Sequence, residues 1–192
     1  GGVGGGEGGG GGERGGGGGG EGGALLGAPR RAGLRELLEQ GRVDDLRARL
    51  GDTGAPSHPL SAVTVLAPIP DPEKIVCIGL NYRSHAAEAG IDPPESPTFF
   101  AKFRNALRPT MATVELPAAS DKVDYEAEVA LVIGRECSSV EEVDAGEYVA
   151  GYMLLNDLSA RDLQFATPQW MPGKVFDGSA PCGPALVTPE EG

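Results

Sequence analysis

Two glutamates lie two residues apart in VDYEAEVALVIG, residues 123–134, a stretch whose other residues are typical of a buried strand. Side chains of a strand alternate between its faces, so Glu126 and Glu128 should point the same way. Like charges on one face repel unless something offsets them. Asp157 ends a later apolar stretch, YVAGYMLLND. Carboxylates that converge are the ligands Mg²⁺ prefers, and we therefore predict a metal site at these three residues.

Alternation alone leaves a second interpretation of the two glutamates open, namely that they lie on a solvated strand face. The sequence also restricts which metal could bind. No His or Cys lies near Glu126, Glu128 or Asp157 in the sequence, which disfavours zinc.

A second candidate pair is His85 and Glu88, in NYRSHAAEAG, residues 81–90. If this segment is helical, positions three apart share a face. A carboxylate beside an imidazole orients the ring and raises its basicity, as a general base requires. The alternative for such a spacing is a surface helical pair of little energetic weight.

A third set of candidates follows Asp157 in the chain. Lys174 lies in WMPGKVFDG, where the Pro-Gly turn could aim its ammonium inward, towards a carboxylate or a developing enolate. Arg161 and Gln164 lie three residues apart and could reach a substrate carboxylate or carbonyl. The alternatives are an exposed lysine and a local structural pair of Arg161 with Asp162.

The elements that must position these residues are mostly short strands. Strands are predicted over residues 60–66, 74–80, 98–103, 124–133, 148–157 and 184–188, and helices over two segments within 34–50, over 82–89 and near 139–147. The remaining segments, 104–122 and 161–178, are predicted to be irregular. Many strands with few helices predict an all-β or a β-rich α+β fold.

Composition excludes several classes of partner. The 192 residues carry 16 Lys and Arg against 28 Asp and Glu, a net charge of −12, which argues against nucleic acid and anionic membranes. No apolar run approaches the roughly 20 residues of a membrane span. Three scattered cysteines without a CxxC suggest a reducing, cytoplasmic setting.

The chain divides by composition into three parts. Residues 1–23 are almost all Gly. We interpret them as a low-complexity tail and assign no function to them. Residues 24–70 are predicted to be a small N-terminal region. Residues 71–192 are predicted to be a domain that carries all the candidate residues, and the family resemblance described next implies that it is a partial catalytic domain. A phosphate-binding Gly loop would need a strand before it and a helix directly after it, and the sequence around the tail offers neither.

Five spaced blocks resemble the catalytic domain of the fumarylacetoacetate hydrolase superfamily. They are KIVCIGLNYRSHAAE, PTFFAKF, DYEAEVALVIGR, AGYMLLNDLSARDLQ and QWMPGKVFDGSAPCGPALVT, in this order, and the resemblance covers roughly residues 60–190. It implies a mixed β-sandwich or β-roll and a homodimer. The family's domain normally continues for several strands beyond the position of Gly192, so we expect an incomplete domain.

The resemblance also implies roles for the candidate residues. The metal would be Mg²⁺, or the similar ions Mn²⁺ or Ca²⁺, held by a Glu-x-Glu strand and a later Asp. His85 with Glu88 would activate a water and Lys174 would be the active-site lysine. Arg161 and Gln164 match positions that touch substrate in some members.

The implied function is that of a metal-dependent hydrolase acting on a 2-oxo or 2,4-dioxo acid, with C–C bond hydrolysis through a metal-stabilised enolate. One alternative is 2-hydroxyhepta-2,4-diene-1,7-dioate isomerase or decarboxylase activity on an intermediate of aromatic catabolism. Another is an inactive, truncated pseudoenzyme that keeps the metal site. A β-domain of unrelated function would need all five blocks to match by coincidence.

Overall fold

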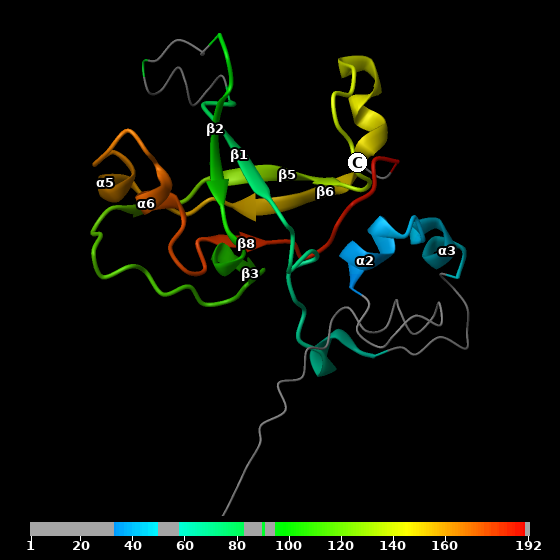
Figure 1. Ribbon diagram of the computed structural model, residues 1–192. Coiled ribbons are helices and arrows are strands. Elements are labelled where there is room, and N and C mark those ends of the chain that lie inside the picture. The colour runs from blue at the N-terminus through cyan, green and yellow to red at the C-terminus, as the bar shows by residue number, and fades with distance from the viewer. Residues whose placement is uncertain (1–32, 50–57, 83–89, 91–94, 191–192) are drawn as a thin grey trace, which may run out of the picture.

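The computed structural model describes residues 33–49, 58–82, 90 and 95–190 (Figure 1). These residues form a β-rich α+β fold, which confirms the predicted class. The described strands make one four-stranded sheet and two two-stranded sheets, and they do not close into a barrel. No helix among the described ranges is long and apolar enough to cross a membrane.

The four-stranded sheet has the order β3-β8-β6-β5. Its strands are β3 (Leu107–Pro109), β8 (Ala180–Cys182), β6 (Val149–Asn156) and β5 (Ala127–Ile133). β3 runs parallel to β8, and the other neighbours are antiparallel. Along β5, burial alternates strictly, so Glu128 shares the partly buried face with Ala130 and Val132, as a period of two requires.

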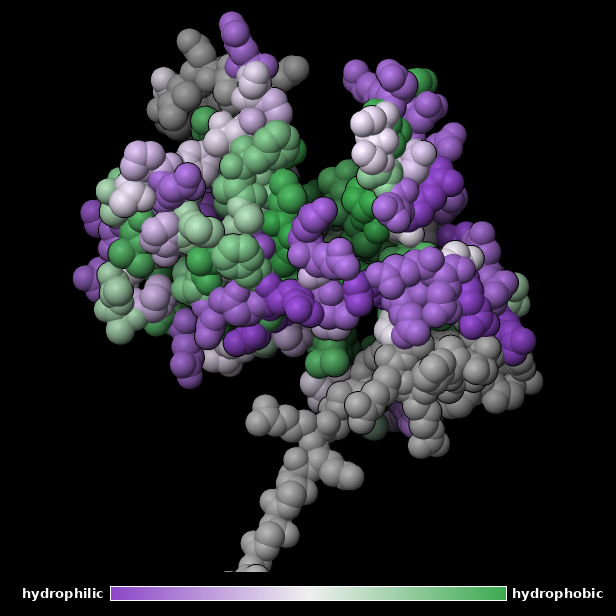
Figure 2. Space-filling model, viewed as in Figure 1, coloured by the Kyte–Doolittle hydropathy of each residue, from purple (hydrophilic) through white to green (hydrophobic). Residues whose placement is uncertain are grey.

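A second sheet pairs β1 (Ile75–Gly79) with β2 (Thr98–Lys102) in antiparallel register, and it crosses β5 and β6 in Figure 1. Val76, Ile78 and Phe99 are exposed on its outer face, and apolar side chains gather there in Figure 2. The inner face carries Cys77 opposite Phe100, and the end residue Lys102. The Lys102 side chain therefore points away from solvent, towards Asp157.

The third sheet decides where the candidate site lies. It pairs β4 (Val123–Asp124) with β7 (Ser159–Ala160). The predicted single strand over 124–133 is therefore wrong, because Asp124 pairs with β7, residues 125–126 belong to no strand, and residues 127–133 pair with β6. Both sides of the ladder are interrupted at the same level, between β4 and β5 and between β6 and β7.

The helices are short. They are α2 (Leu34–Glu39), α3 (Val43–Ala48), α5 (Arg161–Gln164) and α6 (Met171–Lys174), with 3₁₀ turns η1 (Leu60–Ala62), η2 (Arg104–Ala106) and η3 (Glu142–Tyr148). The two helices predicted within 34–50 are confirmed. The loop predicted over 161–178 is wrong in part, since it contains α5 and α6. The strand predicted over 60–66 is wrong, because this segment begins with the 3₁₀ turn η1.

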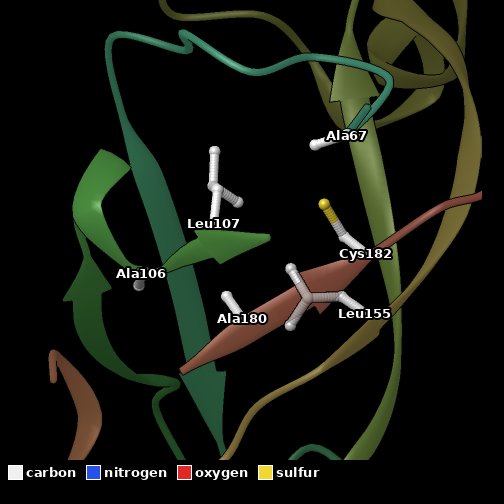
Figure 3. Packing of buried hydrophobic residues seen from close by; sticks show 6 residues of the cluster. All are labelled: Ala67, Ala106, Leu107, Leu155, Ala180 and Cys182. Carbon is white, nitrogen blue, oxygen red and sulfur yellow. The ribbon is translucent and has the colours of Figure 1, made fainter. Parts of the chain in front are cut away.

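A small core joins the four-stranded sheet to the segment before β1. It consists of Ala67, Ala106, Leu107, Leu155, Ala180 and Cys182 (Figure 3). Four of the six are Ala or Cys, so the backbones approach closely. The strand predicted over 184–188 is wrong, because β8 ends at Cys182 and only Val187 bridges to Tyr152 beyond it.

Candidate functional site

A cavity of about 590 Å³ opens beside the interruption in the ladder. Its lining comes from the end of β1 and the residues after it, from the segment between β4 and β5, and from α5 and α6. Five of the eight predicted site residues line it: Glu126, Glu128, Arg161, Gln164 and Lys174. The cavity therefore unites residues that lie far apart in the sequence.

Glu126 and Asp157 face each other across the interrupted ladder. The Asp157 N–H donates to the Glu126 carbonyl oxygen at 2.9 Å, and the Glu126 N–H donates to Asn156 Oδ1 at 3.1 Å. These bonds continue the β5–β6 pairing by one step, so the two carboxyl side chains stay on the same side. Asp157 is fully buried, whereas the Glu126 side chain is 19% exposed.

Lys174 joins the two carboxylates. Its ammonium lies 2.7 Å from Glu126 Oε2 and 2.9 Å from Asp157 Oδ2, and 4.9 Å from the centre of the Phe100 ring. Helix α6 holds it there by close packing. A Cβ atom on Gly173 would lie 2.5 Å from the Gln164 nitrogen and would also overlap the Ala160 carbonyl oxygen.

Arg161 completes the charge pairing at Glu126. Its Nη1 lies 2.6 Å from Glu126 Oε1 and donates to Gln164 Oε1 at 3.0 Å. Its Nη2 and Nε donate to Asp124 Oδ2 at 2.8 and 3.1 Å. The predicted substrate-binding pair Arg161 and Gln164 is therefore in mutual contact, and Asp124, which the sequence did not single out, orients the guanidinium.

These pairs shift the pKa of both partners. Burial alone would raise the pKa of Glu126, but hydrogen bonds and charge from Lys174 and Arg161 outweigh it and hold the pKa below its ordinary range. Burial would lower the pKa of Arg161, and its bonds to Asp124 and Glu126 raise it instead. Both groups are therefore ionised at neutral pH.

Glu128 is the predicted carboxylate with the opposite electrostatics. Burial raises its pKa, and the neighbouring charges of Asp157 and Glu126 raise it further. No cation in the described part of the chain lies within salt-bridge distance of it. Glu128 is thus a half-buried carboxylate beside two others, which is the repulsion that the Glu-x-Glu spacing predicts.

Lys102 is the residue that sequence reasoning missed. Its side chain is fully buried, and its ammonium lies 2.6 Å from Asp157 Oδ1. It also donates to the Lys174 carbonyl oxygen. The signal was a single lysine two residues after Phe100 on one strand face, but only the β1–β2 register shows that this face is the inner one.

An aromatic wall faces the charged residues. The Phe100 and Trp170 rings meet edge to face with centroids 5.6 Å apart. The indole also packs on Gly79, where an added Cβ would lie 2.8 Å from Trp170 Cη2. One side of the cavity is therefore apolar and the other carries charge, an arrangement typical of small-molecule sites.

A sequence profile described as fumarylacetoacetate (FAA) hydrolase C-terminal matches residues 74–192. This covers more than half of the chain. The chain belongs to the fumarylacetoacetate hydrolase family. The resemblance stated from the five blocks is thereby confirmed.

Named members of the fumarylacetoacetate hydrolase family are similar to this chain. A mitochondrial oxaloacetate tautomerase of Bos taurus is 42% identical over 156 residues, which are 80% of this chain and 50% of that protein. The crystal structure of 5-carboxymethyl-2-hydroxymuconate delta-isomerase from Mycobacterium smegmatis has a TM-score of 0.63 at 42% identity, and the match covers 70% of this chain and 53% of that one.

A third relative was crystallised with ligands. Maleylpyruvate hydrolase from Sphingobium sp. SYK-6, in complex with manganese (II) ion and pyruvate, has a TM-score of 0.69 at 29% identity, covering 88% of this chain and 60% of that one. This suggests a divalent metal within the family. The present chain spans about half the length of the curated relatives it matches.

The donor chemistry of this fumarylacetoacetate hydrolase family member fits a hard divalent cation. Glu126, Glu128 and Asp157 offer oxygen ligands, and the raised pKa of Glu128 marks a place where positive charge is favourable. In the described residues no three His, Cys, Asp or Glu side chains are grouped so that they could hold an ion. Guanidinium and ammonium groups pair with Glu126 and Asp157 in this arrangement. His85 and Glu88 lie outside the described residues.

Proposed function

We propose that this chain carries the catalytic centre of an enzyme that moves a proton between carbon and oxygen of a small 2-oxo acid. The observation that carries this proposal is the Lys174 ammonium at the cavity. An ammonium has three N–H donors. Among the described residues two of them are used, by Glu126 and Asp157, so the third remains for a substrate oxygen.

Lys174 would act on the charge that develops during enolisation. Removing a proton next to a 2-oxo group places negative charge on the oxo oxygen. A fixed ammonium held in a partly buried site stabilises such charge more strongly than water does. Arg161, oriented by Asp124, supports a substrate carboxylate at the same end of the cavity.

We propose Mg²⁺ as the resident metal, with Mn²⁺ or Ca²⁺ as substitutes, and Glu126, Glu128 and Asp157 as its ligands. When bound, the metal would polarise the 2-oxo group and the adjacent carboxylate as a Lewis acid. His85 with Glu88 is predicted to activate the water that hydrolysis of a 2,4-dioxo acid requires.

Keto–enol chemistry is favoured because the curated relatives at 40–42% identity include several named oxaloacetate tautomerases. C–C bond hydrolysis of a 2,4-dioxo acid is the second candidate, supported by the similarity to maleylpyruvate hydrolase. Isomerisation of a 2-hydroxydienedioate is supported by the isomerase from Mycobacterium smegmatis and by another from Mycobacterium marinum. All three pass through an enolate, which Lys174 would stabilise: proton transfer forms it in tautomerisation and isomerisation, and in hydrolysis it is the group released when water has added to the distal carbonyl and the C–C bond breaks.

The homodimer and the cytoplasmic location also remain proposals. The family resemblance supports the dimer, and sedimentation velocity would test it. The scattered cysteines support the location, although several curated relatives are named as mitochondrial proteins. Fractionation of cells expressing the full-length protein would decide between the two compartments.

Calorimetric titration of Mg²⁺ and of Mn²⁺ into the chain, with oxalate as an enolate mimic, tests the metal ligands. We expect saturable binding, and Glu128→Ala should weaken it by at least about 10-fold, as loss of metal-supporting groups does. Glu141→Ala is the matched control, because Glu141 is exposed and remote from the cavity. Equal losses in both variants, or no binding by a folded chain, would refute the metal site.

Lys174→Met tests the proton transfer separately. Enol and keto forms of oxaloacetate differ in ultraviolet absorbance, so their interconversion can be followed directly. We expect the variant to lose about 100-fold or more in kcat while it still binds metal, since one electrostatic donor is worth about that much. If the Lys174→Met variant keeps the kcat of the wild type, the proposal is contradicted.

A further inference from the structure

Lys102 is enclosed by the site without reaching the cavity. Its side chain is fully buried, and it is absent from the cavity lining, whereas its strand neighbour Phe100 and its partner Lys174 are part of that lining. A side chain in this position has no direct access to a substrate. Any influence on the reaction must pass through the residues that it contacts.

Those contacts form a closed ring with two site residues. The Lys102 ammonium lies 2.6 Å from Asp157 Oδ1, and Asp157 Oδ2 lies 2.9 Å from the Lys174 ammonium. The Lys174 carbonyl oxygen then accepts a hydrogen bond back from Lys102. One buried ammonium therefore fixes both the carboxylate of Asp157 and the main chain from which Lys174 extends.

A second donor supports the same carbonyl. Ser179 Oγ donates to the Lys174 oxygen at 2.9 Å, so this oxygen has two partners and its peptide cannot rotate freely. Ser179 does not reach Asp157, whereas Lys102 does. The difference separates the two residues: Ser179 holds only the main chain of α6, and Lys102 also fixes the orientation of the Asp157 carboxylate towards Lys174.

Stability alone is a weak reason for a lysine here. Removing a charge from water is costly, and replacing a buried ion pair by apolar residues is often neutral or stabilising. Groups that orient catalytic or metal-binding side chains, by contrast, are retained because their loss lowers activity. The ring geometry fits the second reason.

We propose that Lys102 is a positioning residue, which sets the directions of Asp157 and Lys174 at the cavity. This inference rests on the proposed function, since it assigns Lys102 to the same reaction. It predicts an effect on turnover rather than on substrate binding, because Arg161 and the aromatic wall contact the cavity independently of Lys102.

The main test is Lys102→Met, with exposed Lys74→Met as the matched control. We expect kcat for oxaloacetate tautomerisation to fall about 10- to 100-fold with KM within about threefold, which is the range for orienting partners. Lys74→Met should change neither constant. An unchanged kcat, or a rise in KM with kcat preserved, would overturn the proposal.

A double-mutant cycle shows whether Lys102 acts through Lys174. Residues that act as a unit are non-additive. The loss caused by Lys102→Met should therefore be smaller in a Lys174→Met background, where only its effect on Asp157 remains, and Ser179→Ala should cost less than Lys102→Met. The same full loss in both backgrounds would mean a general structural role and would overturn the proposal.

Coupling in urea unfolding provides a readout that needs no activity. The losses of unfolding free energy caused by Lys102→Met and by Asp157→Asn should not add up in the double variant, whether or not the chain acts on 2-oxo acids. Additive losses would refute the ring. An inactive wild type with coupled unfolding would therefore refute the proposed function alone. If Lys102→Met does not fold, Lys102→Gln, which keeps an amide donor, takes its place with the same expected outcomes.

Discussion

Asp157 shares its two carboxylate oxygens between two ammonium groups, Lys102 on Oδ1 and Lys174 on Oδ2. All three side chains are buried, so each charge would be costly alone. The spacing of Glu126 and Glu128 predicted that some positive charge must lie nearby, and it attributed this charge to a metal. Among the described residues, side-chain charges pair with Glu126 and Asp157, and Glu128 is the carboxylate with a raised pKa.

Thiol reactivity gives a residue-scale prediction with a definite pH dependence. Burial raises the pKa of Cys77 to about 12, with the charge of Asp157 adding to the effect, and burial raises that of Cys182 to about 11. Cys137 is exposed. Because the thiolate is the nucleophile, iodoacetamide at pH 8 should modify Cys137 alone in the folded chain, and all three in denaturant. Intact-mass spectrometry counts the adducts.

The sign of the linked stability effect follows from the same shifts. A thiol whose pKa is raised by folding has no effect on stability below its ordinary value of 9.0. As the pH rises from there towards 12, the folded state loses stability.

Cys137→Ser is the control for the labelling experiment, and it should leave the folded chain without adducts at pH 8. Rapid native labelling of a second cysteine would contradict the burial of Cys77 and Cys182.

At the scale of elements, the interrupted ladder is what makes the site. Glu126 lies between β4 and β5, and Asp157 lies between β6 and β7, so neither is confined within a regular strand. Alternation correctly placed Glu126 and Glu128 towards one side. It did not predict the interruption, because residues 123–133 contain no Gly or Pro, and the change of strand partner depends on tertiary pairing.

The contact between β1 and the aromatic wall leads to a second prediction. Gly79→Ala should destabilise the chain by about 1–3 kcal/mol, because its Cβ would overlap the indole of Trp170. Trp170 is the only tryptophan, so its fluorescence reports directly on the wall. We expect a shifted emission maximum and a lower urea midpoint.

Gly146→Ala is the matched control, since nothing lies within 4 Å of a Cβ built there. It should change the unfolding free energy by less than about 1 kcal/mol, in the range of helix propensity differences. If both variants behave alike, the close packing of Trp170 on Gly79 is wrong.

For the whole molecule, the order of the blocks predicted the family and the β-rich fold class, and both are confirmed. Individual strands at 74–80, 98–103 and 148–157 were also predicted correctly, because their β-branched and aromatic residues dominate their local preference. The register between paired strands could not be predicted from the sequence. For that reason the role of Lys102, which depends on which face of β2 points inward, was missed.

The Gly-rich start of the chain supports a prediction from composition alone. Residues 1–23 contain too few apolar side chains to contribute to a core. Deleting them should leave the urea midpoint and the Mg²⁺ affinity unchanged within error. A clear loss in either quantity would show that this segment has a part in the fold or the site, contrary to the predicted division of the chain.

The ring of Lys102, Asp157 and Lys174 joins positions up to 72 residues apart. Such contacts form only after long loops have closed, and topologies dominated by them fold slowly. The ring is therefore complete only when the two-stranded sheet, the interrupted ladder and α6 have all docked. During refolding, recovery of the native Trp170 environment and of metal affinity should lag behind the recovery of strand content. Any assay of this site is thus also an assay of whether the chain has reached its native topology.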